Sequence, residues 1–149
     1  MWESLFNISC ATEAATGEFA AEVAARLRAG DILLLEGDLG AGKTAFARAL
    51  IRHMTKTPDI VVPSPTFTLV QTYDTASGPI WHFDLYRLKD PDEIFELGWD
   101  DARSGGILLI EWPERLGAHL PKTVLKIALH PVTGNPSART LTVTDTRAR

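Results

Sequence analysis

A glycine-rich stretch that ends in Lys-Thr contains the residue types most able to do chemistry in this chain. Residues 37–44 read GDLGAGKT and satisfy every fixed position of G-x-x-x-x-G-K-[ST]. Its glycines let backbone N–H groups turn towards phosphate oxygens, Lys43 can reach the β and γ phosphates, and the Thr44 hydroxyl can bind Mg²⁺. We therefore expect a nucleotide to contact Asp38, Leu39, Gly40, Ala41, Gly42, Lys43, Thr44 and Ala45.

The segments on either side of this loop predict the elements that hold it. Residues 32–35 are four apolar residues suited to a buried parallel strand. Residues 45–54 repeat apolar side chains at helical spacing. Strand, loop and helix thus follow in the order that phosphate binding needs, with the positive end of the helix dipole at the loop.

Two carboxylates follow apolar stretches and could complete the site. Glu111 comes after residues 107–110, a run typical of a strand buried on both faces, and Asp84 ends a less uniform stretch. Open α/β sheets place ligands at the carboxyl ends of their strands. We favour Glu111 for Mg²⁺ or the attacking water and Asp84 for the outer shell of the metal. Either could instead be a surface carboxylate or a helix-cap group.

Two further residues could act beside the phosphates. Thr66 lies in a proline-shaped loop, at the chain position where other phosphate-loop proteins keep a γ-phosphate switch. A turn hydroxyl bonded to local backbone is the alternative. Trp112 could stack or gate near the nucleotide, or be a buried interface tryptophan. His82 is interpreted as structural.

The rest of the chain predicts further helices and strands. A helix capped by Thr12 is expected over residues 12–28 and a short one over residues 91–97. Residues 68–86 should form a hairpin. Residues 55–65 hold three prolines and should form a shaped loop.

The C-terminal part predicts two strands with no helix between them. Residues 124–129 and 141–144 should therefore pair antiparallel, and residues 145–149 should fray. The fold class that follows is α/β. We predict a P-loop NTPase three-layer sandwich with a mostly parallel central sheet, to which the hairpin and the C-terminal segment add antiparallel strands.

Composition limits the possible functions. With 149 residues, 45% of them apolar, residues 1–149 suit a single P-loop ATPase domain with little room for a substrate domain. The net charge of −4 gives no support to direct nucleic-acid binding. The single cysteine excludes an internal disulfide and a cysteine-built metal site. No apolar run approaches membrane-spanning length, so we expect a cytoplasmic protein without membrane contact.

The base can be chosen by exclusion. Guanine-selective proteins of this kind use an Asn-Lys-x-Asp motif, which neither Asn7 nor Asn135 begins. ATP is therefore the favoured nucleotide.

Four motifs together resemble the bacterial TsaE (formerly YjeE) family. They are the phosphate loop, SPTF at residues 64–67, HFDLYRL at residues 82–88 and IEWPE at residues 110–114. Their order and spacing match the family over nearly the whole chain. Ala45 departs mildly from the family, which often has a threonine at this position.

The resemblance implies the ATPase component of the machinery that makes N6-threonylcarbamoyladenosine (t6A) at position 37 of tRNAs. It implies a weak, Mg²⁺-dependent ATPase that cycles between ATP and ADP as a hydrolytic switch. Its partners would be TsaD, which transfers the threonylcarbamoyl group, and the scaffold protein TsaB. The chain would be a monomer when alone and would meet tRNA only indirectly.

The resemblance also implies roles for single residues in these motifs. By resemblance, Lys43 and Thr44 bind phosphate and Mg²⁺, and Asp84 and Glu111 form the functional acidic pair. Thr66 would belong to the switch loop, and Trp112 would lie beside the site.

Two other classes of function share the phosphate loop. A small-molecule kinase would need an acceptor pocket and usually an arginine-rich lid, which the sequence does not show. A nucleotide-binding interaction module would bind ATP without turnover.

Overall fold

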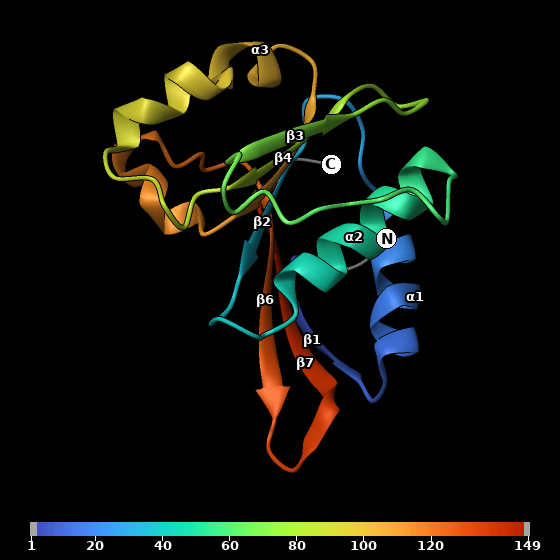
Figure 1. Cartoon of the computed structure of the whole chain (residues 1–149). Coiled ribbons are helices and arrows are strands. Elements are labelled where there is room, and N and C mark those ends of the chain that lie inside the picture. The colour runs from blue at the N-terminus through green and yellow to red at the C-terminus, as the bar shows by residue number, and fades with distance from the viewer. Residues whose placement is uncertain (1–2, 148–149) are drawn as a thin grey trace.

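Seven strands form one mixed sheet in the order β1-β7-β6-β2-β5-β4-β3 in the computed structural model, which describes residues 3–147. Helices lie on both sides of this sheet (Figure 1). The strands are β1 (Leu5–Cys10), β2 (Ile32–Glu36), β3 (Val70–Tyr73), β4 (Ile80–Asp84), β5 (Ile107–Glu111), β6 (Leu125–Val132) and β7 (Asn135–Asp145).

The centre of the sheet is parallel and its two margins are antiparallel. β4, β5, β2 and β6 run parallel to their neighbours in this group. The predicted hairpin adds β3 antiparallel to β4, and the C-terminal segment adds β7 antiparallel to β6. Both antiparallel additions were predicted from the sequence and are confirmed.

The N-terminal strand β1 was not predicted, and it pairs with β7 at the sheet margin. Its side chains alternate between solvent and core. Phe6 and Ile8 pack against the core, and Cys10 is buried within it. This period of two is the signal that could have found the strand.

The helices begin at identifiable caps. The Thr12 hydroxyl accepts a hydrogen bond of 3.1 Å from the Ala15 N–H and starts α1, and Asp90 forms a capping box with Glu93 at the start of η1. α1 ends at Ala24, earlier than predicted, because the chain tightens into turns there. The helices are α1 (Glu13–Ala24), α2 (Lys43–Thr55), η1 (Pro91–Leu97), α3 (Trp99–Arg103) and η2 (Pro113–His119). None of those formed by residues 3–147 is both long and apolar enough to cross a membrane.

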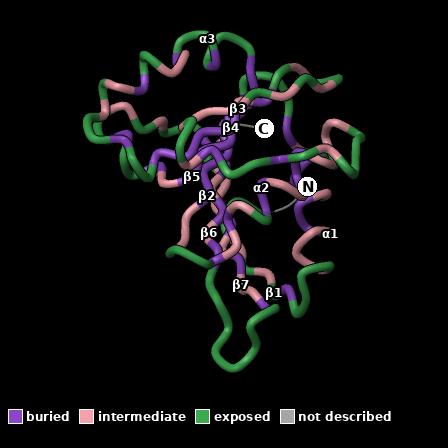
Figure 2. Tube along the Cα trace, viewed as in Figure 1, coloured by how far each residue is buried: buried purple, intermediate pink, exposed green. Residues whose placement is uncertain are grey.

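Two apolar cores lie on opposite faces of the sheet, and Figure 2 shows the central strands as buried. Successive strand residues point to opposite faces, so Leu33 packs in one core and Leu34 in the other. The first core includes Phe46 and Leu50 of α2, whereas the second includes Ile94 of η1 and Trp99 of α3. The predictions that β2 is a buried parallel strand and that β5 is buried on both faces are confirmed.

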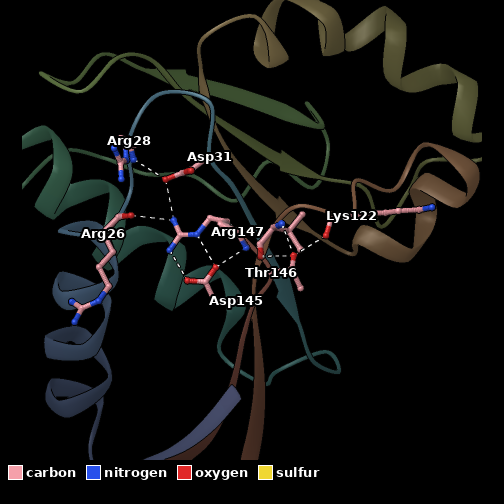
Figure 3. Close-up of polar contacts among 8 residues, drawn as sticks. Arg26, Arg28, Asp31, Lys122, Asp145, Thr146 and Arg147 are labelled. Carbon is pink, nitrogen blue, oxygen red and sulfur yellow. Dashed lines mark hydrogen bonds and ion pairs between the residues drawn. The ribbon is translucent and has the colours of Figure 1, made fainter. Parts of the chain in front are cut away.

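Residues 145–147 are held by hydrogen bonds, which corrects the prediction of fraying for this part of residues 145–149. Arg147, with a side chain only 7% exposed, donates to Asp31 Oδ2 at 3.0 Å and to both carboxylate oxygens of Asp145 at 2.9 Å (Figure 3). Its Nη1 also donates to the Arg26 carbonyl at 3.0 Å. We call Arg147, Asp31 and Asp145 the C-terminal cluster. Residues 148–149 lie outside the described residues.

Candidate functional site

The loop between β2 and α2 needs glycine at both of its ends. Gly37 has φ of +149°, and a Cβ there would lie 2.9 Å from the Ala41 Cβ and from the Leu129 carbonyl oxygen. Gly42, at the N-cap of α2, is left-handed with φ of 99°. These glycines bring the loop around the N-terminus of α2, where backbone N–H groups and the helix dipole favour an anion.

Lys43 holds its ammonium group over this loop. Lys43 is 5% exposed, and its Nζ donates to the Gly37 carbonyl oxygen. The same Nζ lies 3.3 Å from the centre of the Trp112 ring. Burial lowers the pKa of Lys43, although nearby carboxylates, Glu111 foremost, oppose this effect. The loop therefore has a partly desolvated cation at its mouth.

Trp112 reaches Lys43 because its backbone is left-handed, with φ of 58° and ψ of 52°. Its ring also lies 4.9 Å from the ring of Tyr86, measured between centroids. The sequence left open whether Trp112 lies near the nucleotide or in a buried interface. The structure places it against the side chain of the loop lysine.

Glu111 links the phosphate-loop helix to the sheet. Its Oε1 accepts a 3.1 Å hydrogen bond from the Thr44 hydroxyl, and its Oε2 lies 2.7 Å from His82 Nε2. Glu111 is 1% exposed and His82 is fully buried. The parallel register pairs Asp84 with Glu111, so both carboxylates lie at the carboxyl ends of neighbouring strands.

Asp84 binds the proline-shaped loop rather than the phosphate-loop helix. Its Oδ2 accepts a 3.2 Å hydrogen bond from the Thr66 hydroxyl, and its Oδ1 accepts one of 3.0 Å from the Tyr86 N–H. The Thr66 hydroxyl also lies 2.7 Å from that of Ser64. Burial raises the pKa of Asp84, and the charge of Glu111 raises it further, while the two hydrogen bonds partly offset the rise.

These side chains surround a cavity of about 320 Å³. Most of the predicted nucleotide contacts line it, but Ala41 is fully buried and Asp38 is exposed outside it. The lining residues are Leu39, Gly40, Gly42, Lys43, Thr44, Ala45, Ser64, Thr66, Asp84, Tyr86, Glu111 and Trp112.

A second hollow of about 380 Å³ adjoins the loop, between α1, α2, β6 and β7, and shares Gly42 and Ala45 with the first. Arg139 lines it and donates from Nε to the Ala41 carbonyl oxygen at 2.7 Å. The sequence gave no sign of this contact, because 98 residues separate the two partners.

The oxygen donors fit Mg²⁺ better than a metal held by the protein alone. Residues 3–147 contain no group of three or more His, Cys, Asp or Glu side chains that could hold a metal ion. The Thr44 hydroxyl and the Glu111 carboxylate are instead hard donors beside the phosphate loop. Mg²⁺ typically takes one or two protein ligands and completes its shell with phosphates and waters. Such a set suits a metal that arrives with a nucleotide.

A buried strand, a glycine loop and a helix that begins with Lys-Thr are consistent with the P-loop class of nucleotide-binding folds. The comparisons with known proteins narrow this class. The family described as "Threonylcarbamoyl adenosine biosynthesis protein TsaE" matches residues 10–140. This chain belongs to the TsaE family, as its motifs predicted. TsaE proteins take part in tRNA threonylcarbamoyladenosine biosynthesis.

Relatives and a solved structure agree with this assignment. TsaE of Rickettsia felis is 45% identical over 117 residues, 78% of this chain and 68% of the relative. TsaE of Rickettsia bellii is 46% identical over 118 residues, 79% of this chain and 81% of the relative. The crystal structure of YdiB from Bacillus subtilis superimposes with a TM-score of 0.72 at 28% identity, covering 98% of this chain and 88% of YdiB.

Proposed function

We propose that this chain is a Mg²⁺-dependent ATPase with a P-loop NTPase sandwich fold, acting as a hydrolytic switch in t6A modification of tRNA. The observation that carries the proposal is the contact of 3.1 Å between the Thr44 hydroxyl and Glu111 at the mouth of the phosphate loop. This contact supports the proposal because a hydroxyl and a carboxylate beside a phosphate loop are the kinds of donor that the Mg²⁺ of a bound nucleotide uses.

In this proposal, the two hollows bind different parts of the nucleotide. The phosphates take the first cavity, where Lys43 exchanges the Gly37 carbonyl and the Trp112 ring for phosphate oxygens. The base and ribose take the second hollow, beside Arg139. Gly42 and Ala45 line both, so a single ligand can pass from one to the other.

Hydrolysis would use the acidic pair and the proline-shaped loop. Bound Mg²⁺ would neutralise charge on the β and γ phosphates. Glu111 and Thr44 would hold that ion, and Asp84 would orient the attacking water. Its raised pKa, caused first by burial, brings Asp84 closer to the range useful for accepting a proton. Thr66, bonded to Asp84, would register the presence of the γ-phosphate and carry this state to the surface.

The product of the pathway would be made on partner proteins. The net charge of −4 gives no support to direct tRNA binding by bulk charge, so TsaD-like and TsaB-like proteins would hold the tRNA. Phe67, beside Thr66 in the same loop, is 79% exposed. A change at Thr66 would thus reach a large apolar side chain that a partner could sense.

The test measures phosphate release from ATP by the chain alone and with TsaB and TsaD. We expect slow release alone and a rise of about tenfold or more with both partners, as transition-state groups supplied in trans produce. Binding of ATP without release under either condition would contradict the ATPase and favour a binding module. Transfer of the γ-phosphate to a small-molecule acceptor would indicate a kinase.

A further inference from the structure

His82 is a fully buried polar side chain in an otherwise apolar stretch of β4. Its Nδ1 is buried and has no hydrogen-bond partner within residues 3–147. An unpaired buried polar atom costs free energy that an aliphatic side chain would not. Ile80, which lies on the same face two residues earlier, is such an aliphatic residue. The contact made by the other nitrogen, Nε2, is therefore what distinguishes histidine from an aliphatic residue at this position.

That contact fixes one oxygen of Glu111. A carboxylate only accepts hydrogen bonds, so His82 Nε2 is the donor across the 2.7 Å separation from Oε2. The other oxygen, Oε1, faces the Thr44 hydroxyl at 3.1 Å. The imidazole thus holds the carboxylate from behind and limits its rotation, as groups behind metal ligands do.

We propose that His82 is a positioning residue for the Mg²⁺ site. By holding Glu111 Oε2, it keeps Oε1 directed at Thr44 and sets the affinity for the Mg²⁺ that accompanies the nucleotide. This inference rests on the proposed function, because it takes Thr44 and Glu111 as the metal ligands. His82 does not line the phosphate cavity, so it acts through Glu111 and not by touching nucleotide.

The test compares His82→Gln with His82→Met in the full chain. The two side chains are similar in length, but only glutamine keeps an N–H donor. ADP affinity is measured by calorimetry in EDTA and across a series of Mg²⁺ concentrations. We expect the Mg²⁺ concentration for half-maximal effect to rise about 10- to 100-fold in His82→Met and to stay within about threefold of wild type in His82→Gln. ADP affinity in EDTA should stay unchanged in both His82 variants. The control Ile80→Val should change neither the ADP affinity in EDTA nor its dependence on Mg²⁺.

His82→Met with the Mg²⁺ dependence of wild type would overturn the positioning role, as would an equal shift in both His82 variants. A wild-type protein that binds no ADP, or binds it without response to Mg²⁺, would overturn the proposed function instead. If His82→Met does not fold, ¹⁵N NMR reads the ring in wild type. We expect the His82 Nε2–H signal to shift with ADP and Mg²⁺ but not with ADP in EDTA. A signal identical in all states would overturn the role.

Discussion

Within residues 3–147, buried charged side chains lie in the C-terminal cluster and in the candidate site, and their surroundings differ. In the C-terminal cluster, Arg147 is enclosed by Asp31 and Asp145. Although burial alone would lower the pKa of Arg147, hydrogen bonds and charges from these carboxylates raise it. In the candidate site, burial lowers the pKa of Lys43 and raises that of Asp84, so both charged forms are disfavoured.

The difference distinguishes a structural use of buried charge from the functional use that we propose for the candidate site. In the C-terminal cluster, the Arg147 guanidinium bonds to the carboxylates of Asp31 and Asp145 at 2.9 to 3.0 Å. The site borders a cavity of about 320 Å³ and holds its cation against an aromatic ring and a carbonyl oxygen. A buried side chain whose charged form is disfavoured by burial favours a ligand of opposite charge. Variants in the candidate site should therefore change ligand binding more than stability. Variants in the C-terminal cluster should change stability more than ligand binding.

The largest effect on binding is expected for Lys43→Ala. Removing the ammonium group deletes the charge that meets the β and γ phosphates, so ATP affinity should fall by at least about 100-fold. Calorimetric titration with ATP and Mg²⁺ checks this. Lys126→Ala, which removes a half-exposed lysine 3.9 Å from Glu36, is the control and should bind as wild type does. Retained affinity in Lys43→Ala would remove the lysine from the site.

The largest effect on stability is expected for Arg147→Ala. The substitution leaves two carboxylates without their buried cation and should cost about 3 kcal/mol in the free energy of unfolding. Thermal and urea unfolding measure this loss, and the ATP affinity of the folded variant should match wild type. The exposed Arg28 bonds to Asp31 through its backbone N–H and its carbonyl oxygen, which alanine keeps, so Arg28→Ala should change stability by less than about 0.5 kcal/mol. Equal losses in both variants would contradict the structural role.

Asp84→Asn should raise the stability of the protein while lowering its ATP turnover. Because the pKa of Asp84 is raised, the folded state binds more protons than the unfolded state between pH 3.8 and that higher value. Stability therefore falls as pH rises through this window, and the cost persists at pH values above it. The variant should be more stable than wild type at pH 7, with the difference vanishing below pH 3.8, while ATP turnover falls about 100-fold. Loss of stability at pH 7 would contradict this.

Thr66→Val should have the smallest effect. It removes a single hydroxyl contact of 3.2 Å with Asp84 and should lower turnover by about tenfold or less, with ATP affinity retained. Single-turnover phosphate release is the measurement. Thr68→Val, at an exposed hydroxyl nearby, serves as the matched control. Turnover equal to that of wild type would remove Thr66 from the switch.

The two places also differ in how far the sequence could predict them. The phosphate loop, its flanking strand and helix, and the acids at strand ends follow local patterns of glycine, apolar and capping residues. The C-terminal cluster joins residues that are 116 positions apart, so no local pattern marks it. His82 was interpreted as structural from its place in the strand, and its bond to Glu111 could not be predicted because that bond depends on the register between β4 and β5.

One measurement tests the central claim most directly: steady-state phosphate release by wild type and Glu111→Gln with saturating ATP and Mg²⁺, after ATP affinity is measured for each. Wild type should release phosphate, and the variant should bind ATP within about fivefold of wild type but turn over about 100-fold more slowly. Equal phosphate release by the two proteins would show that the carboxylate between Thr44 and His82 takes no part in hydrolysis, and would contradict the account.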